Sequence, residues 1–428
     1  MRELLNRPIH ANHLANVWRR FLLPEGTDLE RLGGVAGFET WLRDRFSENT
    51  RYDVIVTELL MAKGSPADSG PQLFYSAWEL QPEKLTASTS RAFLGVQLQC
   101  AQCHDHPYEE WSQQDFWGYA AFFARISSPE NNPAAMTSGD FQELDTGEVT
   151  LPDTDEVIPV RYLGGELADD EENSRRRLLA DWMVAPDNPY FARATVNRIW
   201  SHLFGRGLVD PPDDMGQQNP ASHPKVLEAL AEYFKQSDYD LRQMIFLLTG
   251  TQAYQLSSSS GESGDAMPEL FHRMAIKSLT AEQMYDSLAA ATCRLQPAQL
   301  GGPTFGLNRV LDQGRQSFLT KMRTPNNGGT KFQSGIPQAL SLMNGGLTAG
   351  ATDGSESDIL QSLQAPFFSD EERLETLFLA TLTRLPQPDE QTTFLAYLET
   401  HDSEETKQRA LGDVLWALLN CAEFALNH

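Results

Sequence analysis

Residues 100–104 read Cys-Ala-Gln-Cys-His, a spacing by which proteins hold a haem covalently. The thiols of Cys100 and Cys103 could add to the two vinyl groups on one edge of the porphyrin, and the adjacent His104 could reach the iron as its axial ligand. The chain has four cysteines among 428 residues, so two in this pattern are not expected by chance. The motif therefore predicts a haem c held by these three residues.

The same residues also suit alternatives to haem. Cys100 and Cys103 could close a disulfide in an oxidising compartment, and the chain would then be a non-redox binding or scaffold module without a cofactor. With His104 and His106 they could instead ligate zinc in a metal-dependent hydrolase, although structural zinc sites usually draw their ligands from two separated knuckles. Both thiols could also be inert residues packed beneath a helix.

Other polar residues could complete a site around this motif. A haem iron takes a second axial donor, for which His13, His202 and His223 are candidates. Asp105 could orient a neighbouring imidazole, as carboxylates do beside metal-bound histidines. Cys293 and Cys421 lie singly in apolar helical surroundings and are expected to be core residues.

Composition excludes some classes of partner. Hydrophobic residues make up 40% of the chain and charged residues 22%, an ordinary balance for a folded protein of two or three domains. The net charge of −25 argues against nucleic acid and against an anionic membrane surface, because both attract clustered Lys and Arg. No stretch approaches the roughly 20 apolar residues that span a bilayer, so no membrane span is expected.

The pattern of apolar residues predicts a mainly α, multi-helix, two-domain protein with a small β-hairpin insert between the domains. The first helical domain covers residues 1–128 and contains the Cys100 motif. A β-containing insert or linker covers 129–168, with β-favouring runs at 148–151 and 157–162. The second helical domain covers 169–428 and ends in a three-helix bundle.

Two local expectations concern elements that carry these sites. Pro82 is expected to open a helix that runs past Phe93 and Val96 and delivers the Cys100 motif at its end. Residues 300–355 are rich in glycine and are expected to be loops, except for a short helix near 337–344.

Longer strings around these residues are similar to a pair of known domains. The run Phe-Leu-Gly-Val-Gln-Leu-Gln-Cys-Ala-Gln-Cys-His-Asp-His-Pro at 93–107, with Trp111 and Asp115-Phe-Trp, resembles the planctomycete domain of unknown function DUF1549. The run Val-Asn-Arg-Ile-Trp-Ser-His-Leu-Phe-Gly-Arg-Gly-Leu-Val at 196–209, with Asp213-Asp-Met and Ser222-His-Pro, resembles its usual partner, DUF1553. Residues 335–344 and 418–424 are similar to the end of that second domain.

The resemblance implies a cellular context rather than a reaction. Such paired domains typically occur in exported bacterial proteins, after a signal peptide and a separate cytochrome-c-like region, and are often encoded near sulfatases and polysaccharide-degrading functions. It therefore implies a periplasmic or secreted protein, with a redox partner or polysaccharide-degrading enzymes as its partners. The N-terminus, Met-Arg-Glu-Leu-Leu, lacks the apolar core of a secretory signal, so the start is expected to be truncated.

Overall fold

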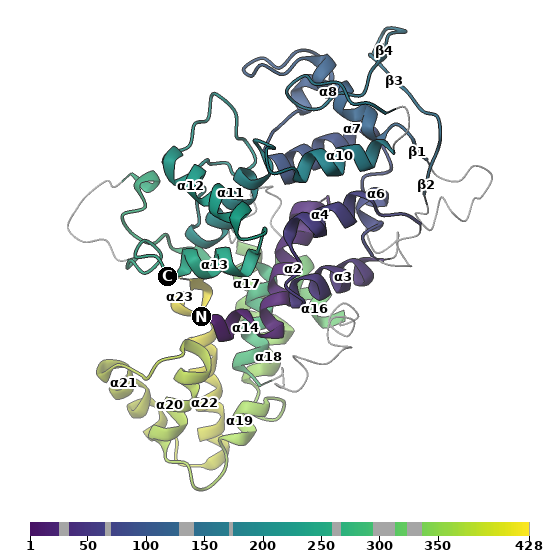
Figure 1. Ribbon diagram of the computed structural model, residues 1–428. Helices are drawn as coiled ribbons and strands as arrows, with labels where there is room; N and C mark the ends of the chain where they lie inside the picture. Colours follow the sequence, from purple (N-terminus) through teal and green to yellow (C-terminus); the bar gives the residue numbers. More distant parts are fainter. Residues whose placement is uncertain are drawn as a thin grey trace. The chain divides into compact units, whose positions relative to one another are not determined.

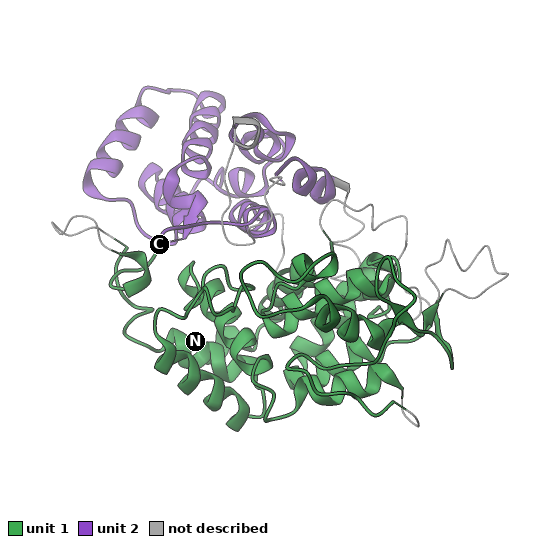
Figure 2. Cartoon of the chain, turned by 90° about the horizontal axis from the view of Figure 1, so that it is seen from above, with its two compact units in different colours: residues 1–275 green, residues 276–428 purple. Residues whose placement is uncertain are grey.

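Helices make up most of the computed structural model, as the spacing of apolar residues predicts (Figure 1). The structure describes residues 1–24, 34–64, 70–127, 141–170, 174–258, 267–293, 313–322 and 336–427. The chain divides into two compact units, Met1–Ala275 and Ile276–His428, coloured green and purple in Figure 2. Each unit has its own hydrophobic core. The predicted fold class, mainly α with a small β-hairpin, is confirmed.

The helices of the two units begin at recognisable start signals. Proline occupies the first turn of several helices, where its missing N–H costs nothing, and Ser or Thr caps others. The first unit contains α1 (Arg2–Leu5), α2 (Pro8–Leu22), α3 (Val35–Ser47), α4 (Tyr52–Leu60), α6 (Leu73–Ala77), α7 (Pro82–Thr89), η2 (Ser90–Leu94), η3 (Gln99–Gln102), α8 (Gln113–Ala120), η4 (Ala121–Phe123), α10 (Arg175–Val184), α11 (Phe191–Phe204), α12 (Pro224–Gln236), α13 (Leu241–Thr249) and η5 (Pro268–Leu270). The second contains α14 (Ala281–Ala291), α16 (Gln313–Met322), α17 (Ile336–Asn344), α18 (Gly346–Thr352), α19 (Asp358–Ser362), α20 (Asp370–Leu382), α21 (Pro388–Glu399), α22 (Glu404–Leu419) and α23 (Ala422–Ala425).

The last long helices, α20, α21 and α22, contact one another, and they correspond to the three helices expected at the end of the chain. No helix in the part of the chain that the structure describes combines the length and the apolar character needed to cross a bilayer.

Strands are short and pair locally. β3 (Val149–Thr150) and β4 (Val157–Ile158) form the antiparallel hairpin that the sequence predicts within the insert. β1 (Ile126–Ser127) pairs with β2 (Gln142–Glu143), and β5 (Lys277–Ser278) pairs with β6 (Leu426–Asn427). Residues 129–140 of the predicted insert lie outside the described residues. The division between compact units falls after Ala275 rather than at this insert.

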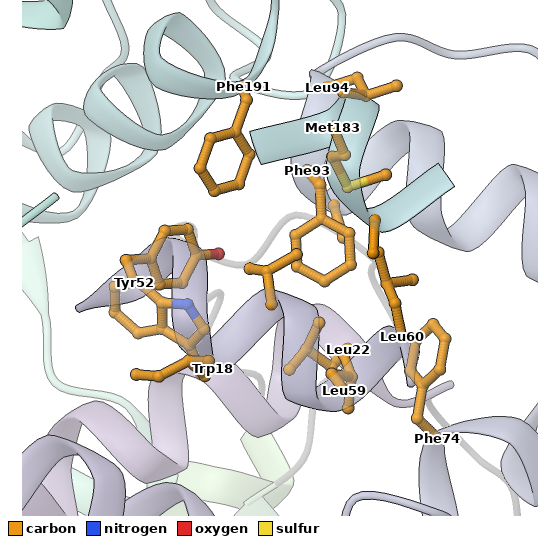
Figure 3. Close-up of a cluster of buried hydrophobic side chains, with 14 of the residues drawn as sticks. Trp18, Leu22, Tyr52, Leu59, Leu60, Phe74, Phe93, Leu94, Met183 and Phe191 are labelled. Atoms are coloured by element: carbon orange, nitrogen blue, oxygen red, sulfur yellow. The ribbon is translucent and has the colours of Figure 1, made fainter. Parts of the chain in front are cut away.

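One core joins the two ends of the first unit. The helix α10 packs on α4, and α11 packs on η2, so residues before the hairpin and residues after it share apolar contacts. Figure 3 shows part of this core, with side chains from α2, α4, α6, η2, α10 and α11: Trp18, Leu22, Tyr52, Leu59, Leu60, Phe74, Phe93, Leu94, Met183 and Phe191.

The helix opened by Pro82 does not reach the Cys100 motif, so that expectation was wrong. α7 continues into a π-helical turn, η2, which ends at Leu94 because Gly95 adopts a left-handed conformation with φ of 68°. A Cβ atom at Gly95 would approach the Met215 sulfur to 2.8 Å, so a side chain here would require the Met215 side chain to shift. Val96 and Leu98, both buried, then lie in an irregular segment that leads to the motif.

The glycine-rich region also holds more helix than expected. The predicted short helix is present as α17, but α16 and α18 occupy described residues that were expected to be loops. α18 lies against α22, where Gly412 meets the carbonyl oxygen of Thr352 without an intervening side chain. Gly412 on α22 therefore permits a close contact between the two helices. Residues 300–312 and 323–335 lie outside the described residues.

Replacing Phe93 with alanine should lower the free energy of unfolding of the first unit by about 3–5 kcal/mol, because this ring is 1% exposed and fills the shared core. Urea unfolding followed by tryptophan fluorescence reports on this unit, since all tryptophans except Trp416 belong to it. Tyr108→Ala is the matched control, because Tyr108 is an aromatic residue of the same unit and is 77% exposed. A loss below about 1 kcal/mol for Phe93→Ala would contradict the shared core.

Candidate functional site

The Cys100 motif lies on a short 3-10 turn whose reactive side chains are exposed. η3 covers Gln99–Gln102, and Cys103 continues it with φ of −105° and ψ of −25°. In such a turn, side chains three residues apart are aligned, so Cys100 and Cys103 share a face. Both thiols are free and exposed, whereas Ala101 between them is fully buried. The turn is therefore anchored through Ala101 and presents its two thiols outward.

The ring of His104 is held by the backbone of the next residue. Its Nδ1 lies 2.7 Å from the carbonyl oxygen of Asp105. A carbonyl oxygen only accepts, so Nδ1 carries the hydrogen, and the lone pair of the neutral ring is on Nε2. This is the tautomer in which an imidazole ligates a metal through Nε2 while its other nitrogen donates to a backbone oxygen. The His104 side chain is exposed and thus accessible to a ligand.

Helix α8 fixes the other side of the motif. Gln113 and Trp117, one helical turn apart, both donate side-chain hydrogen bonds to the Gln102 carbonyl oxygen, at 3.2 Å and 3.0 Å. The backbone N–H of Gln113 donates to the Asp105 carboxylate at 2.9 Å. We expected the Asp105 carboxylate to orient an imidazole. In the structure this carboxylate accepts from Gln113, and the group that orients His104 is the Asp105 carbonyl oxygen. Ser112 and Asp115 cap α8 reciprocally and so fix its start.

His106 has a structural role in the turn after the motif. Its Nδ1 accepts hydrogen bonds from the backbone N–H groups of Glu109 and Tyr108, at 3.0 Å and 3.3 Å. The neutral ring therefore carries its hydrogen on Nε2, which leaves no unshared pair for a metal unless these bonds break. In the described part of the chain, no group of three or more His, Cys, Asp or Glu side chains is arranged to hold a metal ion.

A second loop, residues 213–219, lies against the motif segment. The Met215 N–H donates to the Gly95 carbonyl oxygen at 2.8 Å, and the Glu109 carboxylate accepts from the N–H groups of Gln217 and Gln218 at 2.9 Å and 3.1 Å. Burial raises the pKa of Asp214; the negative charges of Asp213 and Glu109 raise it further, while His106 opposes them. The loop thus adds carboxylates beside the motif. Glu109 was not singled out from the sequence, since its partners are backbone groups far along the chain.

Two known protein families match separate parts of the chain. Residues 1–128 match the family described as protein of unknown function DUF1549, and residues 175–325 match the one described as protein of unknown function DUF1553. The chain pairs a DUF1549 domain with a DUF1553 domain. The predicted pairing of these two domains is confirmed. No curated protein and no solved structure matches the chain.

The two domains both contribute to the site. The DUF1549 domain supplies Cys100, Cys103 and His104, and the DUF1553 domain supplies the loop 213–219 that Glu109 binds. Both segments belong to the same compact unit, Met1–Ala275. The site is therefore a product of the pairing of the domains.

The three histidines proposed as second axial donors have other contacts. His13 and His202 meet each other, with their Nε2 atoms 3.0 Å apart. His223 lies beside the Ser222 hydroxyl, 3.2 Å from Nδ1, and its ring is near Phe271. Of the other cysteines, Cys293 is exposed and Cys421 is partly buried, so the expectation of a core position was wrong for Cys293.

Removing the Glu109 carboxylate should loosen the contact between the two domains at the site. Glu109→Ala should lower the free energy of unfolding by about 1–2 kcal/mol, because two hydrogen bonds to a partly exposed charged acceptor are lost. It should also speed hydrogen–deuterium exchange in residues 213–219. Glu110→Ala, which removes the same charge from an exposed neighbour, is the control. Equal exchange in both variants would contradict this role of Glu109.

Acid should weaken the first unit through His10 on α2. Burial, followed by the charges of His13 and Arg242, lowers the pKa of His10 from 6.5 to about 4. Between these values the unfolded chain binds more protons than the folded one, so the unfolding free energy falls as the pH falls from about 6.5 towards 4. His10→Asn should flatten this part of the pH profile, measured by urea unfolding at a series of pH values. An unchanged slope would show that His10 is not responsible.

Proposed function

We propose that the chain carries a c-type haem on Cys100, Cys103 and His104 and acts as a one-electron redox protein. The observation that carries the proposal is the state of these three side chains. Both thiols are exposed and unbonded on one face of a turn, and the adjacent imidazole has its Nδ1 occupied by a backbone carbonyl, so that Nε2 is the available nitrogen.

The residues fit the requirements of covalent haem. Thioether formation needs two accessible thiols that face the same porphyrin edge, and the 3-10 turn supplies them. The buried Ala101 and the hydrogen bonds from Gln113 and Trp117 hold the turn without using either thiol or His104. Zinc receives less support, because His106 already accepts backbone hydrogen bonds through Nδ1.

In this proposal each residue near the motif has a definite task. Cys100 and Cys103 would hold the haem, and His104 would ligate the iron, oriented by the Asp105 carbonyl. When bound, the haem would supply reversible one-electron transfer. The carboxylates of Asp105, Glu109 and Asp214 would favour the more positively charged ferric state through their negative charge.

The proposal also concerns compartment and partners. Haem c is normally attached outside the cytoplasm, so the protein would be periplasmic or secreted. It would exchange electrons with a redox partner, and the DUF1549 and DUF1553 resemblance suggests that this step serves polysaccharide breakdown.

The test is expression in a periplasm that contains the c-type haem attachment machinery. After denaturation and acid–acetone extraction, the purified chain should retain a Soret band and give a pyridine haemochrome spectrum corresponding to one haem per chain. Cys100→Ser and Cys103→Ser should each reduce this covalent haem, whereas Cys293→Ser and Cys421→Ser, which remove thiols elsewhere, should not. His104→Ala should lower the yield of haem protein or shift its Soret band.

A matured wild-type chain without a Soret band after denaturation would overturn the proposal. Two further measurements on that protein would then identify the alternative. Thiol titration without reductant would reveal two fewer reactive thiols if Cys100 and Cys103 form a disulfide, as in a scaffold module. Elemental analysis would find stoichiometric zinc if the motif is a metal site.

A further inference from the structure

Two histidines outside the Cys100 motif converge from separate helices. His13 on α2 and His202 on α11 are 189 residues apart in the sequence, yet their Nε2 atoms lie 3.0 Å apart. The ring centroids are 5.1 Å apart, with the planes inclined by 35°. Both side chains are half-buried. The Nε2 atom of each ring thus lies within hydrogen-bond distance of the other ring.

The separation of these nitrogens has two chemical interpretations. A single proton shared between two neutral imidazoles gives a hydrogen bond of this length. A metal ion bound by both rings also fits, because Zn–N distances of about 2.0–2.1 Å and N–metal–N angles of about 90–110° place the two nitrogens roughly 2.8–3.4 Å apart. Replacement of the shared proton by a metal ion would keep this nitrogen–nitrogen distance, but each ring would turn so that its lone pair points to the ion rather than to the other nitrogen.

The helices that carry the pair are held together by a neighbouring contact. Arg198, one turn before His202 on α11, lies over the ring of Phe21 on α2, 4.4 Å from its centroid. Trp18 on α2 is buried in the core of the first unit, as is Phe204 on α11. The distance between the two imidazoles is thus set by packing on both helices, so a bound ion would have to turn the rings but not to bring the helices together.

We infer that His13 and His202 form a binding site for a divalent transition-metal ion of the class that prefers imidazole, namely Cu²⁺, Ni²⁺ or Zn²⁺. Because the described residues contain no group of three or more His, Cys, Asp or Glu side chains arranged for a metal, water would fill the remaining positions. Open positions are typical of exchangeable or reactive metal sites rather than of structural ones. The net charge of −25 favours accumulation of cations around the chain.

Copper(II) is a suitable probe, because its electron paramagnetic resonance signal reports the nitrogens bound to it. The full chain is used with Cys100→Ser and Cys103→Ser, so that neither thiols nor haem contribute, and it is first stripped of metal with a chelator. Titration with Cu²⁺ should give about one tightly bound ion per chain. Electron spin echo envelope modulation should detect two coupled imidazoles.

Removal of either ring should weaken binding. His13→Gln and His202→Gln should each lower the Cu²⁺ affinity by at least about tenfold, which corresponds to about 1.4 kcal/mol or more. His401→Gln in the second unit removes an imidazole elsewhere and should leave the affinity unchanged. Circular dichroism checks that each variant is folded.

The outcomes are decisive without reference to haem. Absence of Cu²⁺ binding, fewer than two coupled imidazoles in the histidine-containing protein, or equal affinity in the three histidine variants would each overturn the inference. If a variant fails to fold, the count of coupled imidazoles in the parent protein still decides. Since the cysteines are replaced throughout, failure of the proposed haem attachment would not affect the result.

Discussion

The burial of one set of apolar side chains contributed by both matched domains is the constraint on which the first unit depends. Helix α10 covers α4, and α11 covers η2, so the apolar faces of residues 1–128 are buried partly by residues that follow the hairpin. Hydrophobic burial of this kind dominates folding free energy, and large rings such as Phe93 and Phe191 contribute much of it. Position along the chain is therefore a poor guide to which segments stabilise one another.

The geometry of the Cys100 motif follows from that core. Leu98 and Ala101 are buried and fix the turn, whereas Cys100 and Cys103 are exposed. Gly95 admits the Met215 sulfur, and Glu109 binds the backbone of residues 217–218, so the DUF1553 loop is attached at two points along the DUF1549 segment. A reactive group attached to this turn would be held by a rigid backbone and would remain accessible to solvent.

Much of the fold could be predicted from local patterns. Helical spacing of apolar residues predicted a mainly helical chain with three helices at its end, and β-favouring runs located the β3–β4 hairpin. The break at Gly95 could not be found in this way, because its close contact is with Met215, far along the chain. α18 was missed because its glycines suggest a loop, and the glycine that permits its close contact with α22, Gly412, lies on α22 itself. The motif residues were identifiable from their types alone, but the roles of His106 and the Asp105 carbonyl depend on hydrogen bonds to the backbone, which carry no residue-type signal.

The common core has a consequence for how such a chain can be inherited. Recombination that exchanged one domain for an unrelated partner would leave Leu59, Phe93 and their neighbours facing water, and an exposed apolar surface of that kind promotes aggregation. Selection would then act against the separated domains because they aggregate, whether or not any activity was lost. The two segments would travel between genomes as one gene, even though each is recognised as a distinct sequence family.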